Sequence, residues 1–199
     1  LIETAKKYGL NVIGPNCLGF VNNLCPINAT FGQLVKDSGS LRFVSQSGAL
    51  ATSLFDWCNT SGLGFSQFIT LGNKAVINEN HVLEYFAQSD GPIGLYLESI
   101  SGGPEFLKIA QEISKKNPIF AIKPGKSEMA AKAMKSHTGA IAGADAVLEK
   151  AFLQAGILRC NELEDFFNLA RAFAWEKPPD GPKVAVISNA GGPAVDDAD

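Results

Sequence analysis

The sequence lacks several features that mark common functional classes. No apolar run approaches the roughly 18 residues of a membrane span, and Leu1 opens into an amphipathic pattern with no sign of a signal peptide. An excess of one charge is also missing, because 17 basic and 20 acidic residues give a net charge of −3 without any Lys/Arg cluster. We therefore expect no membrane and no nucleic acid among the binding partners.

Cysteine is scarce and scattered along the chain. The four thiols are Cys17, Cys25, Cys58 and Cys160, and no CxxC pair occurs. A disulfide framework or a zinc site would need closer and more regular spacing. We therefore expect reduced, buried thiols, no metal site and a cytoplasmic location.

Glycine, by contrast, is abundant, and apolar residues suffice for a core. Glycine provides 20 of the 199 residues and hydrophobic residues make up 46 %, which is typical of a folded domain whose backbone turns sharply in several places. Short apolar runs alternate with helical patterns. The runs that predict strands are Asn11–Ile13, Leu41–Val44, Phe65–Leu71, Ile93–Leu97, Ile119–Ile122, Ile157–Arg159 and Lys183–Ser188.

Segments with helical periodicity fill the intervals between these runs. They are Leu1–Tyr8, Ala49–Cys58, Glu79–Ala87, Glu105–Lys116, Ala144–Gln154 and Glu162–Ala174. In Glu105–Lys116, for example, apolar residues recur at helical spacing. Alternating strands and helices predict an α/β fold with a doubly wound parallel sheet, whose strands are buried on both faces.

A change in composition near the carboxyl end predicts a domain boundary. Residues 177–182 read KPPDGP, which is typical of a linker. An apolar strand pattern and a small-residue turn follow over residues 183–199, and such a segment cannot bury its own apolar face. We therefore expect a fragment of a longer protein, with one domain over residues 1–176 and the first strand, turn and helix of a second over residues 183–199.

Two strand-to-helix turns are candidate anion sites. The first is VSQSGAL at residues 44–50, and the same order of apolar strand, small turn and helix start recurs in VISNAGGP at residues 186–193. The N–H groups at a helix start lack partners and attract anions. The residues concerned are Ser47, Gly48 and Ala49 in the first turn and Asn189, Ala190, Gly191 and Gly192 in the second. A plain tight turn, with Ser47 as helix N-cap, is the alternative interpretation.

Two further side chains are candidates for chemistry. His137 lies in the small-residue stretch KSHTGAIAG, which leaves an imidazole room to move and partners room to approach. Glu98 ends the apolar run Ile93–Leu97, and the carboxyl end of a parallel strand is where such folds bind ligands. There a carboxylate can orient an imidazole. An exposed loop acid and an ordinary surface histidine are the alternatives.

Other patterns are weaker. The stretch GKS at residues 125–127 is no P-loop, because Phe120 stands where the first glycine belongs. Ser47, Glu98 and His137 follow the chain order of a hydrolase triad, although the two glycines of the nucleophile elbow are missing. A serine hydrolase therefore remains a minor alternative. Asn16, in the turn GPNCLG, either hydrogen-bonds a substrate or only shapes the turn.

Taken together, these motifs resemble those of the NDP-forming acyl-CoA synthetases, relatives of succinyl-CoA synthetase that include ADP-forming acetyl-CoA synthetase. The segments that carry the resemblance are GPNCLGFVN, FVSQSGALATSLFDW, GLGFSQFITLGNKA, LYLESI, PIFAIKPGKSEMAAKAMKSHTGAIAG and VAVISNAGGP. They cover nearly the whole chain. The resemblance implies a flavodoxin-like ligase domain over residues 1–176, followed by the start of a second flavodoxin-like domain.

The resemblance also implies a mechanism. Acyl-CoA, ADP and phosphate are interconverted with a carboxylic acid, CoA and ATP through a phosphohistidine, which the motif match places at His137, with Glu98 holding the ring. The turns at residues 47–49 and 189–192 cradle the phosphoryl group, and Asn16 and Cys17 lie toward the CoA thiol. The expected cofactors are CoA and ADP or ATP with Mg²⁺, and the expected partners are an ATP-grasp (beta) domain or subunit, an N-terminal CoA-binding Rossmann domain and a small carboxylic acid.

One alternative of another class follows from the same resemblance. Related domains are fused to lysine acetyltransferases, where they sense acyl-CoA or other metabolites without catalysis and often lack the histidine. Retention of His137 argues against that role. One departure from the family pattern is Val76-Ile77-Asn78, where acidic residues are usual.

Overall fold

The computed structural model describes residues 1–32, 39–125 and 145–177, together with residues 179, 181, 183, 185–187 and 189. Its helices are α1 (Ile2–Tyr8), α2 (Gly48–Ser61), α3 (Glu79–Phe86), α4 (Gly103–Ser114), α6 (Asp145–Gln154) and α7 (Leu163–Trp175). Its strands are β1 (Gly19–Asn22), β2 (Ile27–Thr30), β3 (Leu41–Ser45), β4 (Phe65–Thr70), β5 (Ile93–Tyr96), β6 (Ile119–Ile122) and β7 (Ile157–Cys160).

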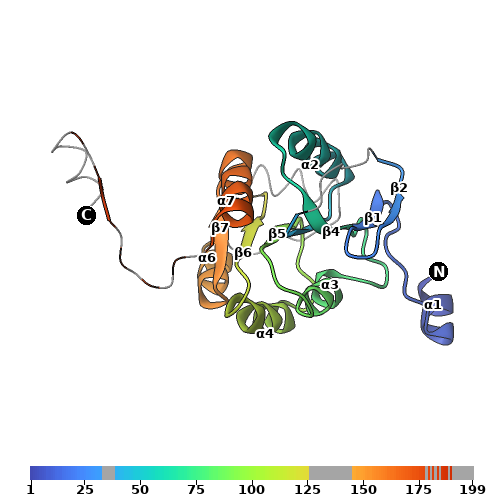
Figure 1. Ribbon diagram of the computed structural model, residues 1–199. Coiled ribbons are helices and arrows are strands. Elements are labelled where there is room, and N and C mark those ends of the chain that lie inside the picture. The colour runs from blue at the N-terminus through green and yellow to red at the C-terminus, as the bar shows by residue number, and fades with distance from the viewer. Residues whose placement is uncertain are drawn as a thin grey trace.

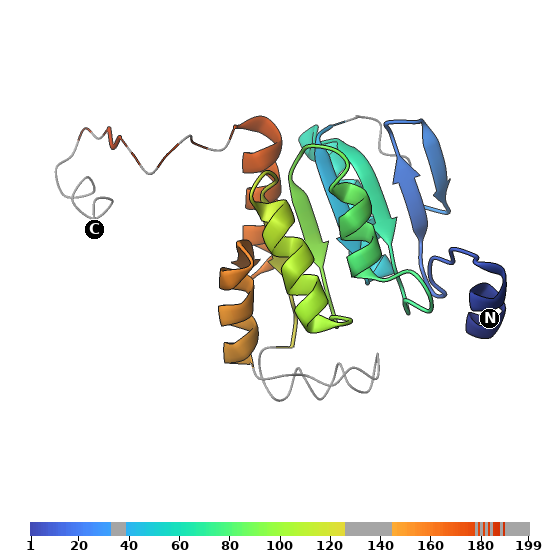
Figure 2. The ribbon, with the colours of Figure 1, turned by 90° about the horizontal axis from the view of Figure 1, so that it is seen from below.

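The strands form one sheet in the order β2-β1-β4-β3-β5-β6-β7. Strands β4, β3, β5, β6 and β7 pair in parallel. Figure 1 shows α2 and α7 on one face of the sheet and α3, α4 and α6 on the other. Figure 2 shows the latter three helices side by side across their face. The doubly wound α/β fold predicted from the alternating pattern is thereby confirmed.

The central strands are buried on both faces, as their continuous apolar runs predict. All five residues of β3 and all six of β4 are buried. On the α2 and α7 face the core is aromatic: the ring centroids of Phe43 and Phe166 lie 5.4 Å apart, and those of Phe120 and Phe166 lie 4.8 Å apart. Gly94 of β5 fits under these rings, because a Cβ there would lie 2.9 Å from the ring of Phe166. The sheet is therefore held in a tightly packed core on this face.

The sheet departs from the predicted strands at its β2 edge. A hairpin of β1 and β2 adds two antiparallel strands beside β4, and the sequence did not reveal it because the residues of β2 are mostly exposed. The predicted strand Asn11–Ile13 is wrong. These residues form no ladder, and Val12 O accepts a hydrogen bond from Ile77 N, in the loop after β4, at 3.1 Å.

The predicted strand Lys183–Ser188 is not seen at the positions that the structure describes. Residues 183 and 185–187 adopt no strand, and Ile187 is 97 % exposed. The physical reason is the one given by the sequence, since a single apolar run without a partner cannot bury its face. The domain boundary at residues 177–182 therefore remains a prediction.

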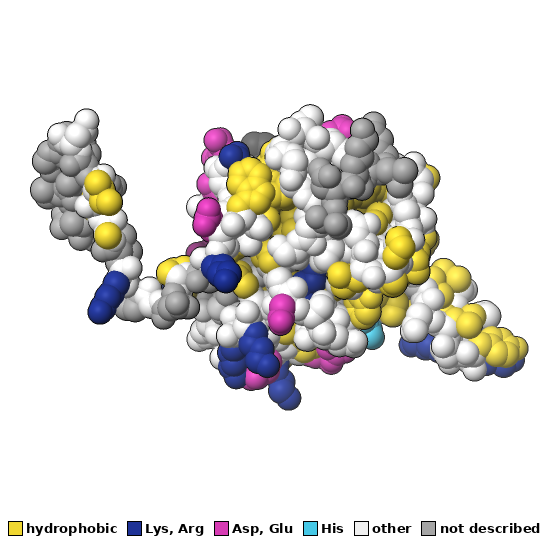
Figure 3. All heavy atoms as spheres, in the orientation of Figure 1, with side chains coloured by type: hydrophobic (Ala, Val, Ile, Leu, Met, Phe, Trp, Pro, Cys, Tyr) yellow, Lys and Arg dark blue, Asp and Glu magenta, His cyan; other side chains and the backbone are white. Residues whose placement is uncertain are grey.

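The outer surface carries apolar as well as charged groups. Every helix among the described residues is too short or too polar to span a lipid bilayer. Figure 3 shows hydrophobic side chains continuing from the main body onto α1, and basic and acidic side chains interspersed on the same face. Leu1 and Tyr8 of this region are 70 % and 64 % exposed.

The order of the strands reverses beside β3. The chain leaves β3 for β4 on one side and later returns to β5 on the other. In open α/β sheets the ligand crevice lies outside the carboxyl ends of the strands at this switch point. Gln46 N donates to Tyr96 O at 3.1 Å, so the loops after β3 and β5 leave the sheet side by side.

Candidate functional site

The first half of the site is the start of α2, directly after β3. Ser47 is the N-cap, and its hydroxyl accepts a hydrogen bond from Leu50 N at 3.3 Å. The Ser45 hydroxyl closes the turn by donating to Ser47 O at 2.7 Å. The amides of Gly48 and Ala49 have no partner inside the helix. Since nothing lies within 4 Å of a Cβ built on Gly48, an anion has room to approach these amides.

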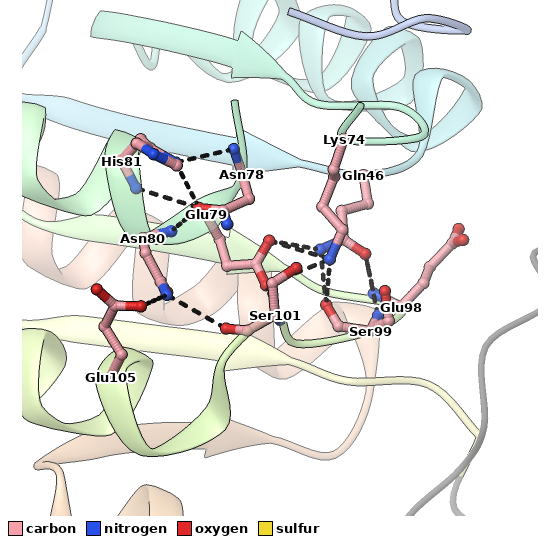
Figure 4. A network of polar contacts seen from close by, with 10 residues as sticks. All are labelled: Gln46, Lys74, Asn78, Glu79, Asn80, His81, Glu98, Ser99, Ser101 and Glu105. Carbon is pink, nitrogen blue, oxygen red and sulfur yellow. Dashed lines mark hydrogen bonds and ion pairs between the residues drawn. The ribbon is translucent and has the colours of Figure 1, made fainter. Parts of the chain in front are cut away.

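The second half of the site is the loop after β5, which carries Glu98. The amides of Glu98 and Ser99 donate to Oε1 of Gln46 at 2.9 and 3.0 Å. Nε2 of the same side chain donates to Ser99 O at 2.8 Å. Figure 4 shows the half-buried Glu98 side chain extending away from these contacts. Its backbone is therefore fixed while its carboxylate faces the cleft that the loop borders.

A buried ion pair supports this loop from the α3 side. The Glu79 side chain is fully buried, and its Oε2 lies 3.0 Å from Lys74 Nζ. Glu79 also accepts a hydrogen bond from Ser101 N, and Lys74 Nζ donates to Ser99 O at 3.1 Å. The Lys74 ammonium and the Glu79 carboxylate thus hold the backbone of Ser99 and Ser101 in the Glu98 loop (Figure 4).

Two further turns meet at the opposite side of the cleft. Gly72 has φ +53°, and a Cβ there would lie 2.2 Å from Asn16 O and 2.3 Å from Pro15 O. Asn73 N donates to Pro15 O at 2.9 Å, and Asn16 Nδ2 donates to Asn73 Oδ1 at 3.3 Å. Only glycine allows this backbone-to-backbone approach, so the turn after β4 holds the turn of Asn16 and Cys17 in place.

These four loops enclose a cleft of about 860 Å³ at the switch point. Its lining is Asn16, Cys17, Leu18, Phe31, Gln46, Ser47, Gly48, Ala49, Thr52, Gly72, Asn73, Lys74, Glu98 and Ser99. The volume falls within the range of roughly 300–1,000 Å³ that is usual for small-molecule sites. The lining combines a helix N-terminus with a carboxylate, hydroxyls and amides. Such a set can bind an anion and orient a proton-carrying partner.

Two half-buried groups respond to the charge of Glu98. Burial raises the pKa of Tyr96, and the Glu98 carboxylate raises it further. Burial lowers the pKa of Lys123, as does the nearby charge of Arg159, whereas Asp145 and Glu98 act in the opposite direction. The charge of Glu98 is therefore felt by groups at the ends of β5 and β6.

The structure brings together part of the predicted site. Ser47, Gly48, Ala49, Glu98, Asn16 and Cys17 all line the same cleft. Ser47 has the N-cap role that the sequence gave as its alternative. His137, Ala190, Gly191 and Gly192 lie outside the described residues, and Asn189 is exposed and not part of the cleft lining. In the part of the chain that is described, no group of three or more His, Cys, Asp or Glu side chains could hold a metal ion.

The sequence did not single out Gln46, Lys74 or Glu79. Gln46 lies inside the strand–turn–helix motif, but spacing does not reveal where its amide points. Glu79 is the first residue of α3, where an acidic residue usually complements the helix dipole at the surface. Of these three residues, only Lys74 could have been suspected from the sequence, because it belongs to the GNKA segment of the family resemblance.

A doubly wound sheet with a cleft at its switch point is typical of α/β domains that bind ligands at the carboxyl ends of their strands. The model of the succinyl-CoA ligase like flavodoxin domain matches residues 38–173. The chain belongs to this family, which confirms the resemblance drawn from its motifs.

Named relatives agree with this placement. The chain is 43 % identical over 201 residues to the alpha subunit of acetate–CoA ligase [ADP-forming] II of Pyrococcus furiosus, covering 100 % of this chain and 44 % of that protein. It is 40 % identical over 201 residues to 4-hydroxybutyrate–CoA ligase [ADP-forming] of Nitrosopumilus maritimus, covering 98 % of this chain and 29 % of that protein. The chain therefore spans less than half the length of either relative.

A solved structure agrees as well. Acetyl-coenzyme A synthetase 1 of Ca. Korarchaeum cryptofilum, in complex with phosphate and ADP, superimposes with a TM-score of 0.85 at 40 % sequence identity. The match covers 91 % of this chain and 40 % of that one.

Proposed function

We propose that this chain is the flavodoxin-like ligase part of an ADP-forming acyl-CoA synthetase. The whole protein would interconvert acyl-CoA, ADP and phosphate with a carboxylic acid, CoA and ATP. Family membership and the ligase names of the relatives support this assignment. The observation that carries it is that the start of α2 and Glu98, on separate loops, line one cleft at the switch point.

The chemistry consists of three transfers. A phosphate oxygen attacks the thioester carbonyl, the C–S bond breaks, and CoA leaves as the thiol, which gives an acyl phosphate. A nitrogen of His137 then attacks phosphorus, the P–O bond to the acyl group breaks, and the carboxylate leaves. Finally an oxygen of ADP attacks the phosphohistidine and restores the free imidazole. A neutral imidazole is a suitable nucleophile near pH 7.

The described residues have distinct roles in this scheme. The amides of Gly48 and Ala49 would bind the phosphoryl oxygens, aided by the partial positive charge of the helix N-terminus. The Glu98 carboxylate would accept the N–H of His137, so that the other ring nitrogen faces phosphorus. Asn16 and Cys17, on the far side of the cleft, would lie toward the thioester.

The remaining components belong to other parts of the protein. An N-terminal Rossmann domain would bind CoA, and an ATP-grasp (beta) domain or subunit would bind ADP or ATP with Mg²⁺. The turn at Asn189, Ala190, Gly191 and Gly192 would supply the second cradle for the phosphoryl group. We place the enzyme in the cytoplasm.

Phosphohistidine formation tests the proposal. The full-length protein, together with its ATP-grasp subunit where that is a separate chain, is incubated with γ-labelled ATP, which labels the enzyme whichever acid it uses. We expect label that is lost in acid and is absent from a His137→Ala variant. Glu98→Gln should lower the labelling rate about 100-fold, whereas Glu84→Gln, at an exposed acid away from the cleft, should leave it unchanged. Label that persists in His137→Ala would reject the assignment.

A further inference from the structure

The Gln46 side chain joins the two halves of the cleft. Its own backbone lies between β3 and the cap of α2, while its amide contacts three backbone groups of the Glu98 loop. Oε1 accepts from Glu98 N at 2.9 Å and from Ser99 N at 3.0 Å, and Nε2 donates to Ser99 O at 2.8 Å. Gln46 is 7 % exposed, so these bonds form largely away from water, where leaving a polar group unpaired is costly.

The orientation of this amide is fixed by its neighbours. Nε2 of Gln46 also lies 3.5 Å from Oε2 of the buried Glu79. An ionised carboxylate only accepts hydrogen bonds, so the NH₂ group must face Glu79 and Ser99 O. Oε1 must then face the two loop amides. Lys74 in turn holds Glu79 through its ion pair of 3.0 Å.

The consequence concerns the relative position of the two halves. The turn that contains Gln46 continues directly into Ser47 and Gly48, which begin the anion-binding end of α2. The loop that Gln46 grips begins at Glu98. Lys74 and Glu79 hold this loop at Ser99 and Ser101, whereas Gln46 is the one side chain among the described residues that bonds the backbone of Glu98 itself. The Gln46 side chain therefore ties the Glu98 backbone to the start of α2.

We propose that Gln46 is a positioning residue, which acts on phosphoryl transfer by holding Glu98 at a fixed distance and angle from the amides of Gly48 and Ala49. The inference rests on the proposed function, because it requires Glu98 to act on the residue that carries the phosphoryl group. A displacement of about 1 Å at such a site can cost about 100-fold in rate.

Three variants of the full-length enzyme separate positioning from folding. Gln46→Met keeps the length of the side chain but removes its hydrogen bonds, and we expect it to lower the rate of enzyme phosphorylation by ATP about 10- to 100-fold with little change in KM for ATP. Gln46→Glu retains acceptors for the loop amides but sets a second carboxylate beside Glu79. Gln46→Glu/Glu79→Gln removes the second carboxylate but still lacks the donor to Ser99 O, so we expect it to recover only part of the rate that Gln46→Glu loses.

A double-mutant cycle with Glu98→Gln tests the route of the effect. If Gln46 acts through Glu98, Gln46→Met should change the rate less than about threefold once Glu98 is already glutamine. Asn80→Ala is the matched control, because Asn80 is buried in the same region and binds Ser101 O at 3.2 Å without touching Glu98 or Ser99. It should lower the melting temperature but not the rate of the folded enzyme.

The outcomes are distinct. Additive losses in the cycle, or an equal loss of rate in Asn80→Ala, would overturn the positioning role. If Gln46→Met does not fold, Gln46→Glu takes its place in the cycle. If the natural enzyme forms phosphohistidine while the Gln46 variants keep its rate, only the role of Gln46 fails. If the natural enzyme forms none, the proposed function itself fails.

Discussion

Lys74 and Glu79 form an ion pair of 3.0 Å in which the carboxylate side chain is completely buried and the ammonium side chain is 11 % exposed. Such a pair gains Coulombic attraction but loses hydration on both partners. Its hydrogen bonds to Ser99 O and Ser101 N offset part of that loss. Removal of one partner is therefore more damaging than removal of both charges.

Lys74→Met should destabilise the protein by about 3–5 kcal/mol, because it leaves the Glu79 carboxylate buried without a cation. The second change Glu79→Gln should recover much of this loss. Denaturant unfolding measures both effects. Lys115→Met is the control, since the ion pair of Lys115 with Glu112 is exposed and should contribute at most about 1 kcal/mol. Equal losses in Lys74→Met and Lys115→Met would contradict the account.

Gly48→Ala should separate stability from phosphate binding. A methyl group there meets nothing within 4 Å in the protein and lies at the start of α2, so the free energy of unfolding should not fall. The same methyl group projects into the cleft where the anion is expected. We expect KM for phosphate to rise about tenfold or more, as for the loss of one or two charge-assisted hydrogen bonds.

Gly103→Ala is the matched control for this prediction. Gly103 is likewise the first residue of its helix, α4, and a Cβ there also meets nothing within 4 Å. It is not part of the cleft lining. Steady-state kinetics should therefore be unchanged in Gly103→Ala. If KM for phosphate were the same in both variants, the start of α2 would not be the anion site.

The buried thiols should make stability fall in alkaline solution. Burial raises the pKa of Cys58 to about 12 and, together with the charge of Asp165, the pKa of Cys160 to about 12. Between the ordinary thiol value near 9 and 12 the native state holds more protons than the unfolded state, so stability declines as pH rises through this window. Below pH 9 both thiols are protonated in the native and the unfolded state, so stability no longer changes with pH on their account.

Denaturant midpoints at pH 8 and pH 10.5 test this decline. Replacement of Cys58 and Cys160 together by alanine should lower stability at both pH values but reduce the difference between them. In the natural protein, iodoacetamide at pH 8 should label the exposed Cys25 and spare Cys58. Rapid labelling of Cys58, or a pH difference that survives the double replacement, would contradict the burial argument.

Gly94→Ala should destabilise the sheet core. The added Cβ would lie 2.9 Å from the ring of Phe166 and 3.0 Å from that of Phe120, closer than carbon atoms pack. Overpacking of this kind costs about 1–3 kcal/mol. Thermal unfolding measures the loss, and Gly181→Ala, where a Cβ meets nothing, is the control. An unchanged melting temperature would show that the rings around Gly94 can shift to admit a methyl group without loss of stability.

The sequence predicted the parallel part of the fold well, because strands buried on both faces leave continuous apolar runs. Leu41–Val44 and Ile93–Leu97 are examples, and each matches its strand within a residue. The β1–β2 hairpin escaped prediction because β2 is a mostly exposed edge strand of four residues, INAT, which lacks the continuous apolar run of the central strands. The strand predicted at Asn11–Ile13 was wrong for the opposite reason. This segment is apolar enough for a strand, but it pairs with no other strand.

The candidate site divides along similar lines. Backbone features such as the helix start at Ser47 and Gly48 follow from residue type and spacing, and they were predicted. The contacts of Gln46 and Glu79 depend on which loops the topology brings together, so no local sequence pattern predicts them. The strand order beside β3 has to be known before a glutamine in one loop can be assigned to a carboxylate in another.

The backbone contact at Gly72 has a practical consequence for redesign. Gly72 approaches Pro15 O and Asn16 O through main-chain atoms, and Asn73 N donates to Pro15 O, so this contact does not depend on side chains; the exposed hydrogen bond between the Asn16 and Asn73 side chains only adds to it. A library randomised at Cys17 and Asn73 should retain the fold of the cleft while the chemistry of one of its walls is exchanged.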